Sequence, residues 1–308
     1  MERLDGGSTV PPHLAGGIVA LGNFDGFHFG HQAVVGAAVA RARAEGRPAL
    51  VATFDPHPVR YFRPDAPPFE LTTLDQKQDL FAAAGADAMV VFRFEAALAA
   101  LAADEFVAAR LVGALAAAGV VTGADFTFGR ARSGNAEVMA ALGEQLGFAA
   151  QAVAPVALDG EPVSSSRIRA ALRAGDTAVA TRLLTRPFAI RRVVQHGDKV
   201  GRTIGYPTAN LDLAGYLRPA YGIYAVRGRL ADGRVLAGAA NLGIRPSFTP
   251  PKELLEPHFF DFAGDLYGQE IEVELVEYLR PEAKFDDLAA LTAQMDADCA
   301  RVRAILAG

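Results

Sequence analysis

The chain has a single cysteine, Cys299, among 308 residues, which excludes an internal disulfide framework and favours a reducing compartment. Long apolar runs are also missing, because glycine or charged residues interrupt every stretch before it could span a bilayer. Residues 1–12 carry Glu2 and Asp5 and lack the pattern of a signal peptide. Basic residues are not in excess, since the net charge is -5, which argues against a nucleic-acid partner. We therefore expect a cytoplasmic protein with neither a membrane nor a nucleic-acid partner.

Hydrophobic residues are plentiful instead, at 51% against 21% charged residues, so the chain can bury a substantial core. Its length favours about two domains. The first half alternates short apolar runs with Ala- and Leu-rich segments, which predicts a parallel sheet covered by helices on both faces. The predicted strands cover 18–21, 49–54, 88–92 and 120–123, and the predicted helices cover 32–45, 76–84, 103–117, 135–146 and 165–174.

The sequence pattern changes near residues 184–188. Short segments with β-branched residues or strand-like alternation follow at 189–195, 222–230, 235–240 and 270–278, and a long helix is predicted over 285–306. The pair Asp232-Gly233 between two of these segments is a strong β-hairpin signal. Short strands separated by turns predict a small antiparallel barrel. We place the domain boundary at Arg186-Pro187, which divides the chain into residues 1–185 and 186–308.

The most informative motif is the string GNFDGFHFGH at 22–31, between the first predicted strand and the first predicted helix. Its two histidines lie at a helix N-terminus, where free backbone N–H groups and the helix dipole favour a phosphate. Imidazoles at that place can donate hydrogen bonds and help to neutralise the charge that develops in phosphoryl transfer. Two histidines near a turn also fit a metal site, so nucleotide chemistry is a hypothesis at this point.

Three further motifs of the first half fit ligand binding and also ordinary structure. The string TFDPHP at 53–58 places His57 on a turn stiffened by prolines, which is common in its own right. The string GADFTFGRARSG at 123–134 offers rings that can stack on a planar ligand and arginines that can hold phosphate, but it also fits a solvated loop. Serines at 164–166 are ordinary N-caps, whereas the arginines in the next turn oppose the helix dipole, so a bound anion would relieve a local conflict.

The second half has two candidate groups. The string GRTIGYPTAN at 201–210 lacks the Gly-Lys-Ser/Thr ending of a Walker A loop and fits a structural turn. Its Thr208 and Asn210 nevertheless offer hard oxygens that suit Mg²⁺. Glu256 stands beside apolar residues, and it fits a surface ion pair as well as a general base for an alcohol.

Taken in order, these motifs resemble those of the prokaryotic bifunctional riboflavin kinase/FAD synthetase (FMN adenylyltransferase) family. In the second half the likeness rests on the strings GYPTAN at 205–210, NLGIRPSF at 241–248, EPH at 256–258 and LRPEAKF at 279–285. It covers about residues 18–308. It implies an α/β nucleotidyltransferase-type doubly wound parallel sheet, followed by a six-stranded antiparallel β-barrel with a C-terminal helix.

The resemblance also implies two reactions: riboflavin is phosphorylated to FMN with ATP, and FMN is adenylylated with ATP to FAD, releasing pyrophosphate. The residues implied in catalysis are His28, His31 and Glu256, the last as the base for the ribityl 5′-hydroxyl. Those implied in nucleotide or phosphate binding are Gly22, Asn23, Phe24, Asp25, Gly26, His57, Ser164, Ser165, Arg167, Arg169, Gly201, Gly205 and Pro207. Those implied in flavin binding are Asp125, Phe126, Phe128 and Arg132, and those implied in Mg²⁺ binding are Thr208 and Asn210.

The chain departs from the family pattern at a few positions. Arg192 stands where the family often has glycine, Pro257 directly follows the implied base, and Ser166 and Ser247 replace common threonines. Other hypotheses stay open: a barrel that only binds flavin, a non-enzymatic flavin sensor or storage protein, or a nucleotidyltransferase for another substrate. The sequence also leaves a homo-oligomer open.

Overall fold

The computed structural model describes residues 1–196, 205–245 and 252–307. Two compact units share the chain: the first comprises residues 1–67 and 74–164, and the second comprises residues 68–73 and the chain from Ser165 onward. The second unit begins ahead of residue 186 because helices α7 (Ser165–Arg173) and α8 (Thr177–Leu184) pack together, and α8 packs on strands of the barrel. The predicted division into 1–185 and 186–308 assigns activities to segments, and it stays a prediction.

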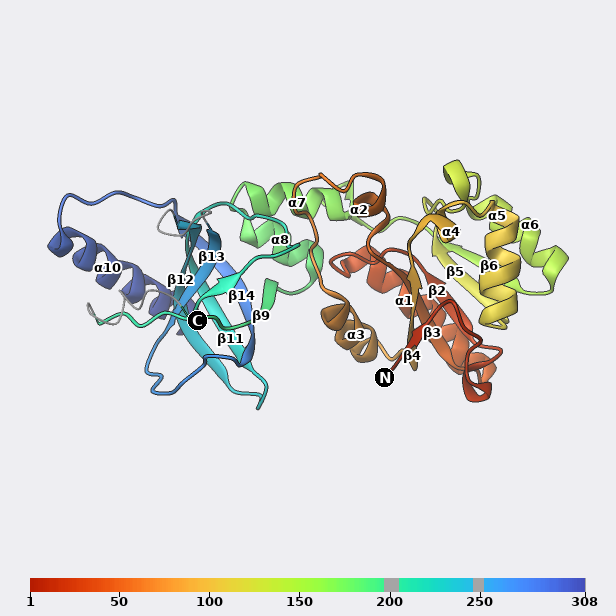
Figure 1. Cartoon of the computed structure of the whole chain (residues 1–308), viewed down its shortest axis with the longest axis horizontal. Helices are drawn as coiled ribbons and strands as arrows, with labels where there is room; N and C mark the ends of the chain where they lie inside the picture. Colours follow the sequence, from red (N-terminus) through yellow and green to blue (C-terminus); the bar gives the residue numbers. More distant parts are fainter. Residues whose placement is uncertain (197–204, 246–251, 308) are drawn as a thin grey trace. The chain divides into compact units, whose positions relative to one another are not determined.

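The first unit is built on a six-stranded sheet (Figure 1). Its strands are β1 (Glu2–Asp5), β2 (Ile18–Leu21), β3 (Ala49–Asp55), β4 (Ala88–Arg93), β5 (Gly119–Gly123) and β6 (Ala149–Val153). They run parallel in the order β1-β4-β3-β2-β5-β6. The order reverses between β2 and β5, and in open parallel sheets the crevice at such a point is where ligands bind.

Helices cover both faces of this sheet. Residues alternate along β2 and β3 between two buried clusters, one that includes Phe106 and Leu111 and one that includes Val35 and Phe81. Strands buried on both faces read as continuous apolar runs, as these do. The helices of the unit are α1 (Phe29–Glu45), α2 (Pro58–Phe62), α3 (Leu74–Ala83), α4 (Ala96–Ala99), α5 (Ala103–Phe106), the π-helix η2 (Val107–Ala114) and α6 (Ala136–Leu146). The predicted doubly wound parallel sheet is confirmed.

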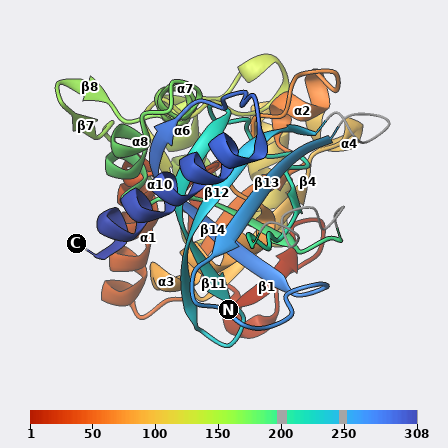
Figure 2. The same cartoon turned by 90° about the vertical axis from the view of Figure 1, so that its left-hand side faces the viewer.

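The second unit contains a six-stranded antiparallel sheet that curls into a nearly closed barrel (Figures 1 and 2). Its strands are β9 (Phe188–Val193), β10 (Leu211–Asp212), β11 (Gly222–Leu230), β12 (Val235–Arg245), β13 (Lys252–Phe259) and β14 (Glu270–Arg280), in the order β10-β13-β12-β11-β14-β9. The two end strands meet where the N–H of Gln195 donates to the carbonyl of Asn210 at 2.8 Å. Arg192 also forms an ion pair with Asp212 at 3.0 Å, so this departure from the family pattern helps to close the seam.

The long helix α10 (Leu288–Ala307) packs on the outer face of β11 and β12, where Val302 meets Ala225. The barrel interior is filled from the opposite face of the strands by side chains such as Tyr224 and Leu242, both fully buried. The predicted six-stranded barrel with a C-terminal helix is therefore confirmed. None of the helices in the described part of the chain is long and apolar enough to cross a membrane.

Most predicted elements form at or near their predicted bounds, and the Asp232-Gly233 hairpin joins β11 to β12. The helix expected over 103–117 is instead the short α5 continued by the π-helix η2, and the last helix begins at Leu288 rather than at residue 285. Strands β1, β6, β10 and β13 and helices α2, α4 and α8 were not predicted. A hairpin of β7 (Ala157–Leu158) and β8 (Glu161–Pro162) lies between β6 and α7.

Two candidate active sites

The histidine turn follows β2, at the point where the strand order of the parallel sheet reverses. Its backbone is left-handed at Phe24 (φ 50°), Gly26 (φ 82°) and Phe27 (φ 43°), which is strained for the two phenylalanines. Their rings are buried edge-on against Phe81, with centroid distances of 5.6 and 5.2 Å. Gly22 is needed because a Cβ there would lie 2.9 Å from the Phe24 ring. Aromatic burial thus holds the turn in its strained shape.

The two histidines lie together at the start of α1. His28 is the N-cap residue, and its Nδ1 accepts the backbone N–H of His31 at 3.3 Å. Their rings are stacked, with centroids 3.5 Å apart and planes inclined by 17°. Because Nδ1 of His28 accepts, the neutral ring carries its proton on Nε2, where it can donate to an anion. Both rings therefore lie at a helix N-terminus, and their role as hydrogen-bond donors to a ligand stays a prediction.

A buried lysine fixes the start of the same turn. Lys77 of α3 donates to the carbonyl of Asn23 at 3.0 Å, and the hydroxyl of Thr53 donates to the same oxygen at 3.0 Å. Both donors are buried. The side-chain oxygen Oδ1 of Asn23 is buried and has no hydrogen-bond partner among the described residues, so it is available to a ligand. Lys77 was not among the predicted site residues.

A cavity of about 680 Å³ lies beside this turn, within the range typical of small-molecule sites. It is lined mainly by residues at the end of β3 and in the segments that follow β3, β4 and β5, and Asn23 after β2 also lines it. The lining includes Asn23, Phe54, His57, Phe62, Phe94, Phe106, Phe126, Phe128 and Arg132. The rings of Phe126 and Phe128 are nearly parallel, with centroids 6.1 Å apart. The predicted residues Phe126, Phe128, Arg132 and His57 are brought together here. Asp125 does not line the cavity and is exposed.

The predicted second phosphate motif spans the junction of the two units. Ser164 ends the first unit, and α7 begins the second with Ser165. Within the second unit, Nε of Arg169 donates to the carbonyl of Phe69 at 2.8 Å, and its guanidinium lies 5.3 Å from the Phe69 ring centroid. Arg169 therefore holds the segment 68–73, a contact that the sequence did not suggest. The phosphate roles of Ser164, Ser165, Arg167 and Arg169 stay predictions.

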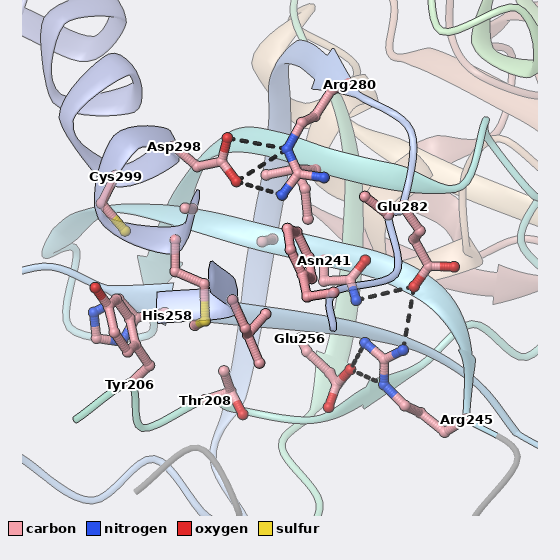
Figure 3. Close-up of a pocket in the computed structure, with 17 residues that line it drawn as sticks. Tyr206, Thr208, Asn241, Arg245, Glu256, His258, Arg280, Glu282, Asp298 and Cys299 are labelled. Atoms are coloured by element: carbon pink, nitrogen blue, oxygen red, sulfur yellow. Dashed lines mark hydrogen bonds and ion pairs between the residues drawn. The ribbon is translucent and has the colours of Figure 1, made fainter. Parts of the chain in front are cut away.

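The barrel has its own cavity, of about 520 Å³, between the outer face of the sheet and α10 (Figure 3). Strand register builds its polar end. Asn241 of β12 lies opposite Glu256 of β13. On the other side of β13, Leu211 lies opposite Leu255, and the N–H of Ala209 donates to the carbonyl of Pro257 at 2.9 Å. This register places Asn210 opposite Glu256. Glu256 and Asn241 thus lie side by side on β13 and β12 and line the cavity, and Asn210 continues this row directly before β10.

Charged groups are paired at this polar end. Two nitrogens of Arg245 contact Oε2 of Glu256, and a third lies 3.2 Å from Oε1 of Glu282, which also accepts from Asn241 at 3.1 Å. Burial lowers the pKa of Arg245, but the carboxylates of Glu256 and Glu282 outweigh it, so the net pKa is raised. Oε1 of Glu256 makes no hydrogen bond to any described residue. Glu256 is therefore an ion-pair partner inside a cavity rather than on an open surface.

The other end of the barrel cavity is largely apolar and is covered by α10. It is lined by Ile223, Ala239, Phe285, Leu291, Met295 and Cys299, with Tyr206 and His258 at its edge. Arg280 of β14 binds Asp298 of α10 through two nitrogens, with a shortest distance of 2.6 Å, and so anchors the helix. A hydrogen bond from Tyr206 to Asp296 raises the pKa of Tyr206 to about 12, so its hydroxyl stays protonated at neutral pH.

The remaining predicted residues of the second half have varied positions. Thr208 lines the cavity, and Asn210 is buried at the strand edge. The carbonyl of Pro207 contacts Nδ1 of His258 at 2.9 Å, and Gly205 is exposed. Gly201 and Ser247 lie outside the described residues. The N–H of Ala209 donates to the carbonyl of Pro257, but Pro257 has no N–H that could donate to the carbonyl of Ala209. These two residues therefore share one backbone hydrogen bond where two are usual.

Each of these two cavities lies within one compact unit, and one of them lies beside a turn at a helix N-terminus, an arrangement that fits an enzyme with two sites and a ligand that carries phosphate. The FAD synthetase family model matches residues 10–167, and the riboflavin kinase family model matches residues 184–306. The bifunctional riboflavin kinase/FMN adenylyltransferase of Haemophilus influenzae is 37% identical over 99% of both chains. The enzyme of the same name from Pseudomonas fluorescens is 38% identical, covering 100% of this chain and 98% of its own. The chain belongs to the family of bifunctional riboflavin kinase/FMN adenylyltransferases.

A solved structure agrees with the fold. The crystal structure named as a macrolide-efflux protein from Streptococcus pneumoniae matches with a TM-score of 0.86, at 30% identity over 97% of both chains. Its likeness concerns the fold that the two chains share.

Proposed function

We propose that the two compact units divide the two reactions of flavin cofactor biosynthesis between them. As a member of its family the chain phosphorylates riboflavin to FMN with ATP and then adenylylates FMN with ATP to FAD, releasing pyrophosphate. We assign the kinase step to the barrel cavity and the adenylyl step to the cavity of the parallel sheet. The observation that carries this assignment is that each cavity lies within a single unit and has its own polar and apolar parts. A cytoplasmic location stays a prediction.

In the adenylyl step, the FMN phosphate attacks the α-phosphorus of ATP in line, and pyrophosphate leaves. His28 and His31 at the N-terminus of α1 donate hydrogen bonds to the phosphates as negative charge builds up. Phe126 and Phe128 offer ring faces and edges to the flavin, and Arg132 offers a guanidinium to a phosphate. The nucleophile is already an anion, so this unit needs positioning and electrostatics rather than a base.

In the kinase step, Oε1 of Glu256 accepts the proton of the ribityl 5′-hydroxyl, and the alcohol oxygen attacks the γ-phosphorus while ADP leaves. The apolar end of the cavity holds the ring system of riboflavin. Thr208 and Asn210 supply a hydroxyl and an amide oxygen next to the Glu256 carboxylate, a donor set that fits Mg²⁺. When bound with ATP, Mg²⁺ shields the charge of the phosphates.

A time course with riboflavin, ATP and Mg²⁺, in which chromatography separates riboflavin, FMN and FAD, tests this proposal. We expect FMN to appear first and FAD to follow. The assignment of the two reactions to separate sites is tested by supplying FMN and ATP to a Glu256→Gln variant. We expect this variant to make FAD at the same rate as the unmodified protein. Loss of FAD formation in this variant, with folding intact, would show that the two reactions share one site.

A further inference from the structure

Arg245, the last residue of β12, is the centre of the charged group in the barrel cavity. It contacts only one oxygen of Glu256, Oε2, and it does so with two nitrogens. The second oxygen, Oε1, points away from Arg245, on the side of Thr208 (Figure 3). We propose that Arg245 is a positioning residue for the kinase reaction, which holds Glu256 by Oε2 so that Oε1 faces the substrate alcohol. The proposal rests on the role of Glu256 as the base.

The strand register explains how this contact forms. Arg245 lies opposite Lys252, while Asn241 lies opposite Glu256, so the Arg245 side chain reaches diagonally across the intervening pair of Gly243 and Leu254. Gly243 leaves the space for this arrangement. A Cβ at that position would lie 2.3 Å from Oε1 of Glu282, the atom that contacts Arg245 from the other side.

Glu282 and Asn241 limit the freedom of the guanidinium. Nη1 of Arg245 lies 3.2 Å from Oε1 of Glu282, and Nδ2 of Asn241 donates to the same oxygen at 3.1 Å. The side chains of Arg245 and Glu256 are 25% and 17% exposed, so bulk water screens their attraction only in part. An arginine fork held on both sides fixes the direction of the carboxylate that it binds, and a base must lie within hydrogen-bond reach of its proton.

Replacing Arg245 with glutamine should therefore lower the turnover of the kinase. We expect Arg245→Gln to reduce kcat for FMN formation by about ten- to a hundredfold, because a misdirected catalytic group costs up to about 10²-fold. The KM values for riboflavin and ATP should change by less than about threefold, since all three guanidinium nitrogens of Arg245 contact Glu256 or Glu282. Arg245→Lys, which keeps the charge but not the fork, should recover part of kcat.

Two controls separate positioning from general damage. Arg218 forms a similar pair with Glu253 of the same strand, at 2.6 Å, and neither residue lines the cavity. Arg218→Gln should leave kcat for FMN formation unchanged. FAD formation from supplied FMN should be unchanged in Arg245→Gln, which shows that the first unit has folded, and the unchanged KM values for riboflavin and ATP show that the barrel has folded.

A double-mutant cycle with Glu256→Gln decides whether Arg245 acts through Glu256. We expect the double variant to be no slower than Glu256→Gln alone, because a residue that only positions Glu256 has nothing left to position. Losses that multiply would overturn the proposal, as would an unchanged kcat in Arg245→Gln while Glu256→Gln is inactive. A normal kcat in Glu256→Gln would instead overturn the role of Glu256 as the base.

Discussion

The two units build their sites by different means. In the parallel unit the polar groups lie on loops after strand ends, and a strained turn fixed by buried phenylalanines carries the histidines. In the barrel Glu256 and Asn241 lie on the neighbouring strands β13 and β12, with Asn210 directly before β10, and strand register fixes their positions.

The difference in chemistry follows the nucleophile. A phosphate monoester is largely dianionic at neutral pH, with a second pKa of about 6, so it can attack without a base. An alcohol keeps its proton and needs a carboxylate within reach. The barrel cavity includes a glutamate with an oxygen that bonds to no described residue, whereas the lining found for the first cavity contains no carboxylate. Under the proposed assignment, each site offers what its own nucleophile requires.

The largest effect is expected from Glu256→Gln, which removes the proposed base of the barrel site and leaves the site of the parallel unit unchanged. Loss of a general base typically costs about 10²- to 10⁴-fold, so FMN formation should fall by that factor. Chromatographic rates of both steps provide the measurement. Glu253→Gln on the same strand serves as the control, because Glu253 pairs with Arg218 and Tyr221 outside the cavity. We expect the control to form FMN at close to the unmodified rate.

The converse change is His28→Ala in the parallel unit. Removing one donor to a developing charge typically costs about 10²- to 10³-fold, so FAD formation from supplied FMN should fall by that factor while FMN formation stays unchanged. His13→Ala is a matched control, since His13 is exposed and contacts Glu2 at 2.8 Å. Equal loss of both reactions in His28→Ala would contradict separate sites.

A smaller effect is expected from Lys77→Met, which tests whether the buried lysine helps to hold the strained turn of the parallel unit in place. This variant removes the bond to the carbonyl of Asn23 and leaves a buried acceptor with one donor fewer. We expect FAD formation to slow by about tenfold, with an unfolding free energy lower by about 1–3 kcal/mol. FMN formation should be unchanged. The two rates and thermal unfolding give the test, and an unaltered FAD rate would show that the turn keeps its shape without Lys77.

The smallest effect is expected on the chemical labelling of Cys299, which lines the barrel cavity. Burial, together with the nearby carboxylates of Asp298 and Asp296, raises the pKa of Cys299 to about 11. Only the thiolate reacts with iodoacetamide, so labelling should be slow at pH 7 and should still rise with pH beyond about 10, where an ordinary thiol, with a pKa of about 8.5, has levelled off. Riboflavin should slow labelling further, by a few-fold. A rate that is already level at about pH 10 would contradict the raised pKa.

Three of the strands missed from the sequence lack the apolar pattern on which strand prediction depends. Strands β1 and β6 are the two edges of the parallel sheet, and their residues are mostly exposed, so they lack the apolar run of a central strand. Strand β13 contains Lys252, Glu253, Glu256 and Pro257, which obscure its alternation. It is a strand because β12 and β10 pair with it on either side.

The two-part organisation, the histidine turn, the hairpin at Asp232-Gly233 and the family can all be read from the sequence alone. Each of these is encoded in residues that are close together along the chain, through the spacing of apolar residues, turn chemistry or a contiguous motif. The partners of the site residues, in contrast, are known only from the folded chain. Lys77 meets Asn23 across 54 positions, and Glu282 meets Arg245 across 37. Such contacts arise from strand order and register, and the packing of distant segments sets both.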